Sequence, residues 1–365
     1  MLSDLNSLVL VERFTILIFL MNFSVSLASM NSKLFYFPRK QINYIQVNHS
    51  GLIALFVYII LFVLGLLTVD WSSVVDSYQV GAGFTLLFGS FYLMNYVLIG
   101  FYADAYIKGK KVKYILSFIF FMYFIFLALG VKQVVLWSGI TLLLTRVICD
   151  VYLGRELKVN KIRILCACII ILIIAGVITK YRVNRSLPED LDLFILPWLV
   201  YLWETGFTVL GGLNTIELVD KSSINLFPFG SMGDFFGLLI PSFFGDWRES
   251  IWMYREFSQQ HAIETLGTNH LIGEIYLSTG NIFLFSMWFY CFSFIISSLV
   301  RYLLSTRNML LIPLISYALV FVIIYPIRGG FYSGMKLFTS YGLLNLVFII
   351  ILRSLLSRIG PNNRE

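Results

Sequence analysis

Charged residues are scarce in this chain. Asp, Glu, Lys and Arg make up 13% of its 365 residues, whereas a water-soluble domain carries roughly 25%. Histidine occurs three times and cysteine four times, while hydrophobic residues reach 59%. This balance excludes an ordinary soluble globular protein.

Cysteine spacing excludes a disulfide scaffold and a zinc site. The four cysteines lie in or beside apolar runs, where cysteine acts as a small hydrophobic residue: Cys149, Cys166, Cys168 and Cys291. Glycine-rich phosphate loops, Ser-His-Asp spacing and heme or flavin signatures are absent, so we expect neither a metal nor another cofactor. The sequence also lacks repeats and similarity between its halves, which disfavours a transporter.

Long apolar runs dominate what is present. A helix needs about 20 mostly apolar residues to cross a bilayer, and such runs recur near 14–30, 52–69, 80–103, 114–130, 134–149, 164–179, 282–300, 309–325 and 337–352. They predict an all-α polytopic membrane protein with a bundle of about 9–11 transmembrane helices. The first run ends in "SLASMNSKLFYFPRK" without a small-residue cleavage site, so we expect a span rather than a signal peptide.

Basic residues gather in alternate connections, which predicts the topology. Positive loops stay in the cytoplasm, and the clusters are Lys33, Arg39 and Lys40; Lys108, Lys110, Lys111 and Lys113; Arg155, Lys158, Lys161 and Arg163; Arg301 and Arg307; and Arg353, Arg358 and Arg364. The connection "VDWSSVVDSYQ" has two aspartates and no cation. We therefore expect the N-terminus outside and the C-terminus inside, and we assign the net charge of +7 to topology rather than to nucleic-acid binding.

One long interruption divides the chain into three parts. We expect an N-terminal bundle over 1–179, a long outer loop over 180–281 that holds most of the acidic residues, and C-terminal helices over 282–365. The stretches "LFILPWLVYLW" and "DFFGLLIPSFFGDW" are apolar, short and broken by proline. They predict re-entrant or interfacial helices lining a cavity, although two additional crossings would preserve the topology.

A histidine and a carboxylate stand one helical turn apart in "GTNHLIGEIYLSTGN", just before a span. If a helix begins near Asn269 and continues into that span, His270, Glu274 and Ser278 share a face. His270 can then act as a base near neutral pH, oriented by Glu274. The alternative is a solvated pair at an interfacial helix start.

Arginines of the outer side are the next candidates. Arg328, in "IIYPIRGGFYSGMK", follows the helix breaker Pro326 and precedes two glycines. Guanidinium groups bind phosphate oxygens in a bidentate manner. Arg248 and Arg255 lie seven residues apart with Trp252 between them, which suits a sugar-phosphate cleft or a membrane-surface helix equally. Membrane anchoring is the alternative for Arg328.

Three further signals are weaker. Asp190-x-Asp192 resembles the motif with which metal-dependent glycosyltransferases hold a divalent cation, but this spacing occurs by chance in most chains. Glu204 lies in an apolar stretch, and a structural hydrogen bond is as good an explanation for it as catalysis. His261, in a polar stretch, is interpreted as a surface residue.

The order of these features resembles the bacterial O-antigen and capsule repeat-unit polymerases of the Wzy class and their sibling O-antigen ligases. In those families a large periplasmic loop ends in a segment "GE-x-Y-x-x-x-G" before a span, which is "HLIGEIYLSTG" here and includes Tyr276. The stretch "YLWETGFTVLGGLNTIEL", followed by "FPFG", resembles the start of that loop.

The resemblance implies a GT-C-like fold in the bacterial inner membrane and metal-independent glycosyl transfer on the periplasmic face. The substrate would be a polyprenyl-diphosphate-linked oligosaccharide, with membrane lipids and a chain-length regulator as further partners. His270 and Glu274 would be catalytic, and Arg248, Arg255, Arg328, Trp252 and Tyr276 would bind the diphosphate or sugar. The alternatives are an O-antigen ligase, a polysaccharide flippase or other transporter, and a membrane acyltransferase.

Overall fold

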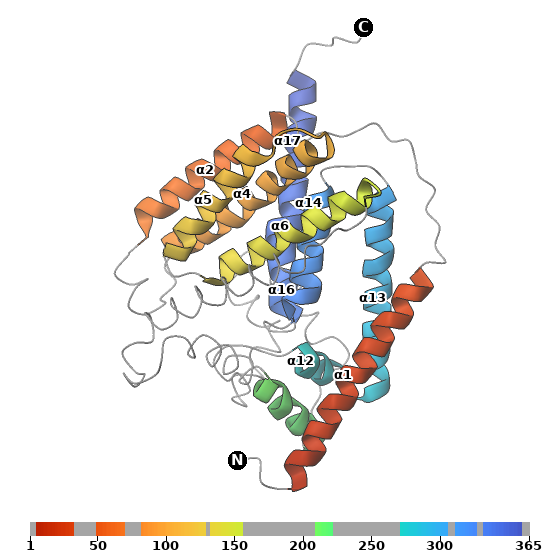
Figure 1. Cartoon of the computed structure of the whole chain (residues 1–365). Coiled ribbons are helices and arrows are strands. Elements are labelled where there is room, and N and C mark those ends of the chain that lie inside the picture. The colour runs from red at the N-terminus through yellow and green to blue at the C-terminus, as the bar shows by residue number, and fades with distance from the viewer. Residues whose placement is uncertain are drawn as a thin grey trace, which may run out of the picture. The chain divides into compact units, whose positions relative to one another are not determined.

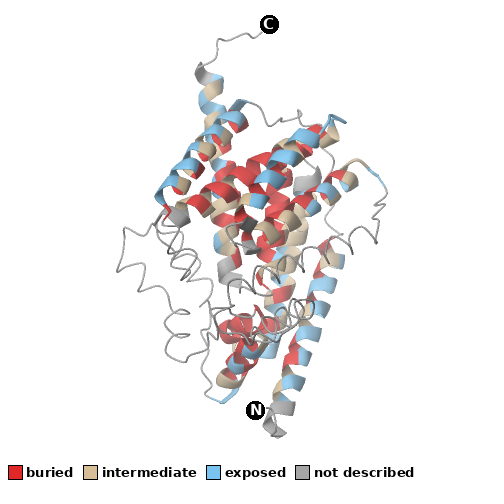
Figure 2. Ribbon diagram, turned by 60° about the vertical axis from the view of Figure 1, so that its left-hand side comes forward, coloured by how far each residue is buried: buried red, intermediate tan, exposed pale blue. Residues whose placement is uncertain are grey.

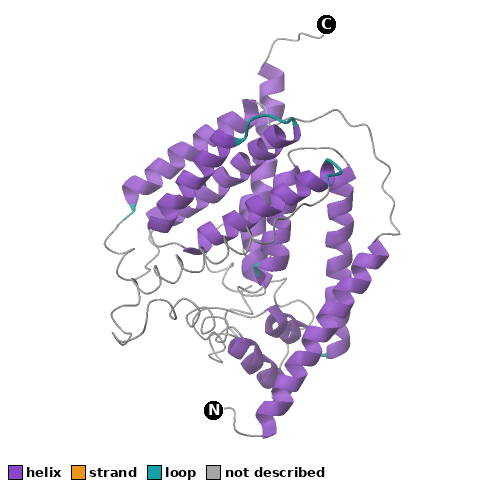
Figure 3. Ribbon diagram, viewed as in Figure 1, coloured by secondary structure: helices purple, strands orange, loops and turns teal. Residues whose placement is uncertain are grey.

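The computed structural model describes residues 5–32, 49–69, 82–128, 132–155, 209–221, 271–305, 311–326 and 331–359. Every regular element in these ranges is a helix, and none of them contains a strand (Figure 3). The predicted helical class is therefore confirmed for this part of the chain.

Six described helices are long and apolar enough to cross a membrane: Val9–Asn31, His49–Thr68, Leu86–Ile107, Val134–Tyr152, Ile282–Tyr302 and Gly334–Ser357. Two shorter apolar helices cover Lys113–Phe126 and Leu311–Ile324. Together they coincide with eight of the nine predicted runs, and the ninth, 164–179, lies outside the described residues. The protein is thus an all-α, multi-pass membrane protein.

Two compact units make up the fold, each assembled from separate stretches of chain. The first combines Met1–Lys40, Trp203–Thr306 and Phe321–Phe338, and the second combines Gln41–Leu202, Arg307–Val320 and Thr339–Glu365. The three-part division along the sequence stays a prediction, because it concerns the loop, most of which lies outside the described residues.

The second unit is built around α4 (Ala82–Ile107), which packs against α2 (His49–Thr68), α5 (Lys113–Ala128), α6 (Lys132–Tyr152) and α14 (Leu311–Ala318) (Figure 1). A further helix, α17 (Leu344–Ile359), packs against α2. A Cβ added at Gly65 of α2 would lie 2.8 Å from the backbone nitrogen of Leu87. Small residues of this kind allow membrane helices to approach closely.

Buried hydrogen bonds join the helices of this unit. Tyr123 donates to the Asn95 side-chain oxygen at 3.0 Å, and Asn95 donates to the Tyr317 hydroxyl at 3.2 Å. Tyr58 donates to Asn345 at 2.6 Å. Since a polar group in an apolar interior is costly unless it is paired, these bonds specify which helix faces meet. Figure 2 shows buried residues gathered where the helices face one another.

The first unit pairs α1 (Leu5–Asn31) with α13 (Ile282–Ser305) along much of their lengths (Figure 1). Asn31, the last residue of α1, donates to the hydroxyl of Tyr290 in α13 at 2.8 Å. The short helix α12 (Leu271–Thr279) contacts α1, α13 and α16 (Phe331–Leu337), and a further helix covers 209–221.

The helix that follows His270 is not continuous with the next span, so the condition of one unbroken helix is not met. Helix α12 ends at Thr279, and α13 begins at Ile282. Gly280 has a φ of 72°, and its N–H bonds the Tyr276 carbonyl at 2.8 Å, which is a left-handed helix cap. The Asn281 side chain then accepts the Leu284 N–H at 2.8 Å and starts the new helix.

Proline and glycine shape the chain near the predicted Arg328 site. The π-helical stretch Leu319–Ile324 (η3) ends two residues before Pro326, where the sequence predicts the end of the helix. A Cβ at Gly334 would lie 2.1 Å from the Phe321 carbonyl oxygen. Helix α16 therefore packs so closely against this stretch that any side chain at position 334 would displace it.

Candidate functional site

Two helices within the predicted outer loop, about 50 residues apart in the sequence, cross at a pair of glycines. Gly273 of α12 faces Gly212 of helix 209–221, and a Cβ added at Gly273 would lie 3.1 Å from the Gly212 Cα. The Thr215 Cβ would be 3.2 Å away. Because no side chain separates the two backbones, the residues that flank this crossing are held in a fixed relation.

A polar cluster of three residues lies near this crossing and joins it to α1. Arg13 forms an ion pair with Asp220, with 2.6 Å between Nη1 and Oδ2. Tyr276 of α12 donates its hydroxyl to Asp220 Oδ1 at 3.0 Å and accepts from Arg13 Nη2 at 3.1 Å. The three side chains thus form a closed ring of hydrogen bonds from three separate segments of the chain.

Burial differs strongly around this ring. Tyr276 is only 2% exposed, whereas the side chains of Arg13 and Asp220 are 38% and 22% exposed. Burial raises the pKa of Tyr276 above its ordinary value, and the negative charge of Asp220 adds to this effect. The phenol therefore stays neutral at physiological pH and can donate and accept at the same time.

Glu274 lies within the fold rather than on its surface. Its residue is 1% exposed, and Ser278, one turn later, is 6% exposed and donates to the Glu274 carbonyl oxygen at 2.9 Å. The alternative of a solvated carboxylate is therefore wrong for Glu274. A buried carboxylate needs hydrogen bonds or an opposite charge to be stable, which makes its surroundings chemically specific.

Most of the other predicted site residues lie outside the described residues: His270, Arg248, Trp252, Arg255 and Arg328, as well as Asp190, Asp192, Glu204 and His261. Of the predicted set, the structure describes Glu274 and Tyr276, and it places both on α12. Their roles as catalytic and substrate-binding residues stay predictions.

Two residues of the cluster were not predicted as site residues from the sequence. In the sequence, Asp220 is one of many acidic residues in the predicted loop. Arg13 is a single cation at the edge of the first apolar run, and a charge at that depth is expensive unless it is paired or wet. That rule was the one available signal for Arg13, and its partner lies far away in the sequence.

Arg13 and Asp220 neutralise each other, and the Tyr276 hydroxyl bonds to both, so the cluster ties α12 to α1 and to helix 209–221. Within the described ranges, no group of three His, Cys, Asp or Glu side chains lies close enough to hold a metal ion. Fold and site together define the class as a multi-pass helical membrane protein with a polar site on α12. No family model, no curated protein and no solved structure matches this chain.

Proposed function

We propose that the protein polymerises polyprenyl-diphosphate-linked oligosaccharide repeat units by glycosyl transfer at the periplasmic face of the bacterial inner membrane. The observation that carries this proposal is the crossing of Gly273 and Gly212. It joins Leu271–Thr279 to helix 209–221, and these helices belong to "HLIGEIYLSTG" and "YLWETGFTVLGGLNTIEL", the two stretches on which the resemblance to the polymerases rests. Segments that are far apart in the sequence thereby form one local structure.

The chemistry needs few groups. Diphosphate is a good leaving group once its developing negative charge is neutralised, and fixed guanidinium groups supply that neutralisation without a metal. In this mechanism Arg248, Arg255 and Arg328 bind the diphosphate. His270 takes the proton of the acceptor hydroxyl, a step typically worth about 10²–10⁴-fold in rate. Glu274, one turn further along, orients the imidazole and stabilises its charged form.

The cluster of Arg13, Asp220 and Tyr276 has a positioning role in this proposal. Its bonds fix α12 against α1 and against helix 209–221, and α12 contains Glu274. An ion pair with two hydrogen bonds to a neutral phenol resists rotation of α12, because rotation would separate all three groups.

Deletion of the gene, followed by complementation, tests the proposal through the banding pattern of surface polysaccharide. We expect the deletion to leave a single repeat attached, and His270→Ala or Arg328→Ala to do the same at normal protein levels. Lys336→Ala, an exposed cation on α16, is the matched control and should retain long chains. Absence of any attached repeat would instead indicate a ligase. Accumulation on the inner leaflet would indicate a flippase.

A further inference from the structure

Two arginines stack on one tyrosine in the second unit, far in sequence from the site described above. The Arg146 guanidinium carbon lies 4.2 Å from the centroid of the Tyr106 ring, and that of Arg155 lies 5.5 Å from it. Arg155 Nη1 also donates to the Tyr106 hydroxyl at 3.2 Å. Two like charges are thus held beside the same ring at the joined ends of α4 and α6.

A single carboxylate holds this arrangement together. Asp150 accepts the Tyr106 hydroxyl at 2.6 Å through one oxygen and Arg146 Nε at 3.0 Å through the other. One carboxylate neutralises one of the two guanidinium groups, so the cluster keeps a net positive charge. A guanidinium has five N–H donors, and the bond from Arg155 to Tyr106 uses one.

The backbone fixes both helix ends at this place. Gly109 after α4 and Gly154 after α6 have φ values of 65° and 66°. Lys110 N bonds the Ala105 carbonyl at 2.8 Å, and Arg155 N bonds the Asp150 carbonyl at 2.9 Å. These are left-handed caps of the Schellman type. They direct Arg155 back toward Tyr106 and turn the chain after α4 into the exposed lysines Lys108, Lys110, Lys111 and Lys113.

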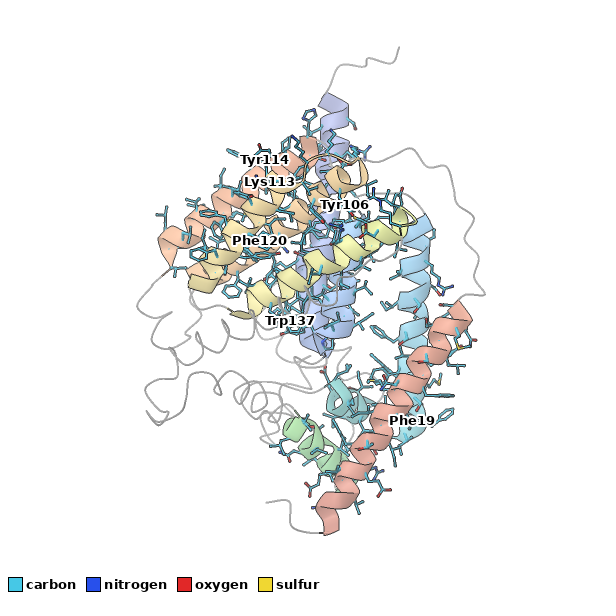
Figure 4. All side chains as sticks on the ribbon, viewed as in Figure 1. Phe19, Tyr106, Lys113, Tyr114, Phe120 and Trp137 are labelled. Atoms are coloured by element: carbon cyan, nitrogen blue, oxygen red, sulfur yellow. The ribbon has the colours of Figure 1, made fainter. Side chains whose placement is uncertain are left out.

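The depth of the cluster suits a lipid headgroup. Arg146 lies six residues before the end of α6, which corresponds to about 9 Å of helix. Leu143, three residues earlier on the same face, is 61% exposed, and the Arg146 side chain is 51% exposed. An exposed apolar side chain therefore lies one helical turn before an exposed guanidinium. Figure 4 shows Tyr106 near the ends of α4 and α6, with Lys113 and Tyr114 at the start of α5.

We propose that this end of α4 and α6 binds the phosphate group of an anionic phospholipid between Arg146 and Arg155. Guanidinium groups bind phosphate in a bidentate manner, which a lysine does not. The neighbouring lysines raise the local concentration of anionic lipid. Membrane orientation requires only positive charge on the cytoplasmic side, so it does not explain why two arginines share one aromatic ring.

Purified full-length protein tests the proposal, with retained lipid counted by native mass spectrometry and thermal protection measured in mixed micelles. The probes are phosphatidylglycerol, phosphatidylcholine and inorganic phosphate. We expect phosphatidylglycerol to bind preferentially, and Arg146→Gln and Arg155→Gln each to weaken it about fivefold. Arg353→Gln, an exposed arginine of α17 in the same unit, is the matched control and should change binding less than about twofold.

Should Arg146→Gln fail to fold, Arg155→Gln carries the loss-of-binding test, since Arg155 lies beyond the helix end. If Arg353→Gln weakens phosphatidylglycerol binding as much as the other two variants do, the proposal is overturned. The lipid would then be attracted by the overall positive charge rather than by this site. Equal protection by inorganic phosphate would overturn the lipid as the source of the phosphate, and equal binding of phosphatidylcholine would overturn the role of charge.

Discussion

The hydroxyl of Tyr276 lies between two opposite charges and bonds to both. It donates to Asp220 and accepts from Arg13, while those two side chains bond each other. A phenylalanine could fill the same volume, but Asp220 and Arg13 would each lose one hydrogen bond. The tyrosine in "GE-x-Y" thus has a structural explanation that does not depend on substrate, although the sequence suggests a substrate-binding role.

Tyr276→Phe tests this explanation. Each lost hydrogen bond costs about 1 kcal/mol, so we expect the free energy of unfolding to fall by about 1–3 kcal/mol. Thermal unfolding of the purified protein in detergent measures the change. Tyr114→Phe is the matched control, because Tyr114 is 78% exposed and should tolerate the change. Equal melting temperatures for the two variants would show that the ring of hydrogen bonds contributes nothing to stability.

The ring could not be predicted from the sequence, for a reason that lies in its chain distances. Arg13 and Tyr276 are 263 residues apart, and Asp220 and Tyr276 are 56 apart. Apolar run length predicts where a helix lies but not which helix faces it. Only the cost of a charge at the edge of a membrane span marked Arg13 as a residue that needs a partner.

At the scale of elements, glycines decide where α12 ends and what it packs against. The break between α12 and α13 was readable in "STGN", because glycine favours a left-handed cap and asparagine starts helices. The apolar run that follows begins at once and masks this signal, so the sequence also allows one continuous helix. For Gly273 the sequence gives only part of the answer. A glycine inside a helix indicates close packing, but the sequence does not reveal that the partner is Gly212.

Gly273→Ala tests the crossing. The added Cβ would lie 3.1 Å from the Gly212 Cα, and this backbone atom can move only with its whole helix. We expect a loss of about 1–3 kcal/mol from overpacking, with a lower melting temperature and shorter polysaccharide chains. Gly139→Ala of α6 is the matched control, since a Cβ there meets nothing within 4 Å. If both variants melt alike, the two helices do not cross as closely as described.

At the scale of the whole molecule, the sequence predicts the helical class well because apolar length is a local property. Eight predicted runs have described helices at their positions. Many of these helices also expose large apolar side chains, among them Phe19, Phe56, Leu67, Phe124 and Phe283, as lipid contact requires. The division into two units could not be predicted, because each unit combines stretches that are separated in the sequence.

Topology is the property on which the two proposals jointly depend, since glycosyl transfer needs α12 outside and anionic lipid binding needs the lysine-rich turn inside. Lys221→Cys and Lys111→Cys form a matched pair, because both lysines are exposed. A membrane-impermeant maleimide should label Lys221→Cys in intact cells and Lys111→Cys only after lysis, in a background without the native cysteines.

Labelling of both in intact cells would place the two segments on one side, contrary to the charge alternation. The reverse pattern would invert the protein, so that the proposed site would face the cytoplasm and lose access to a donor carried in the outer leaflet.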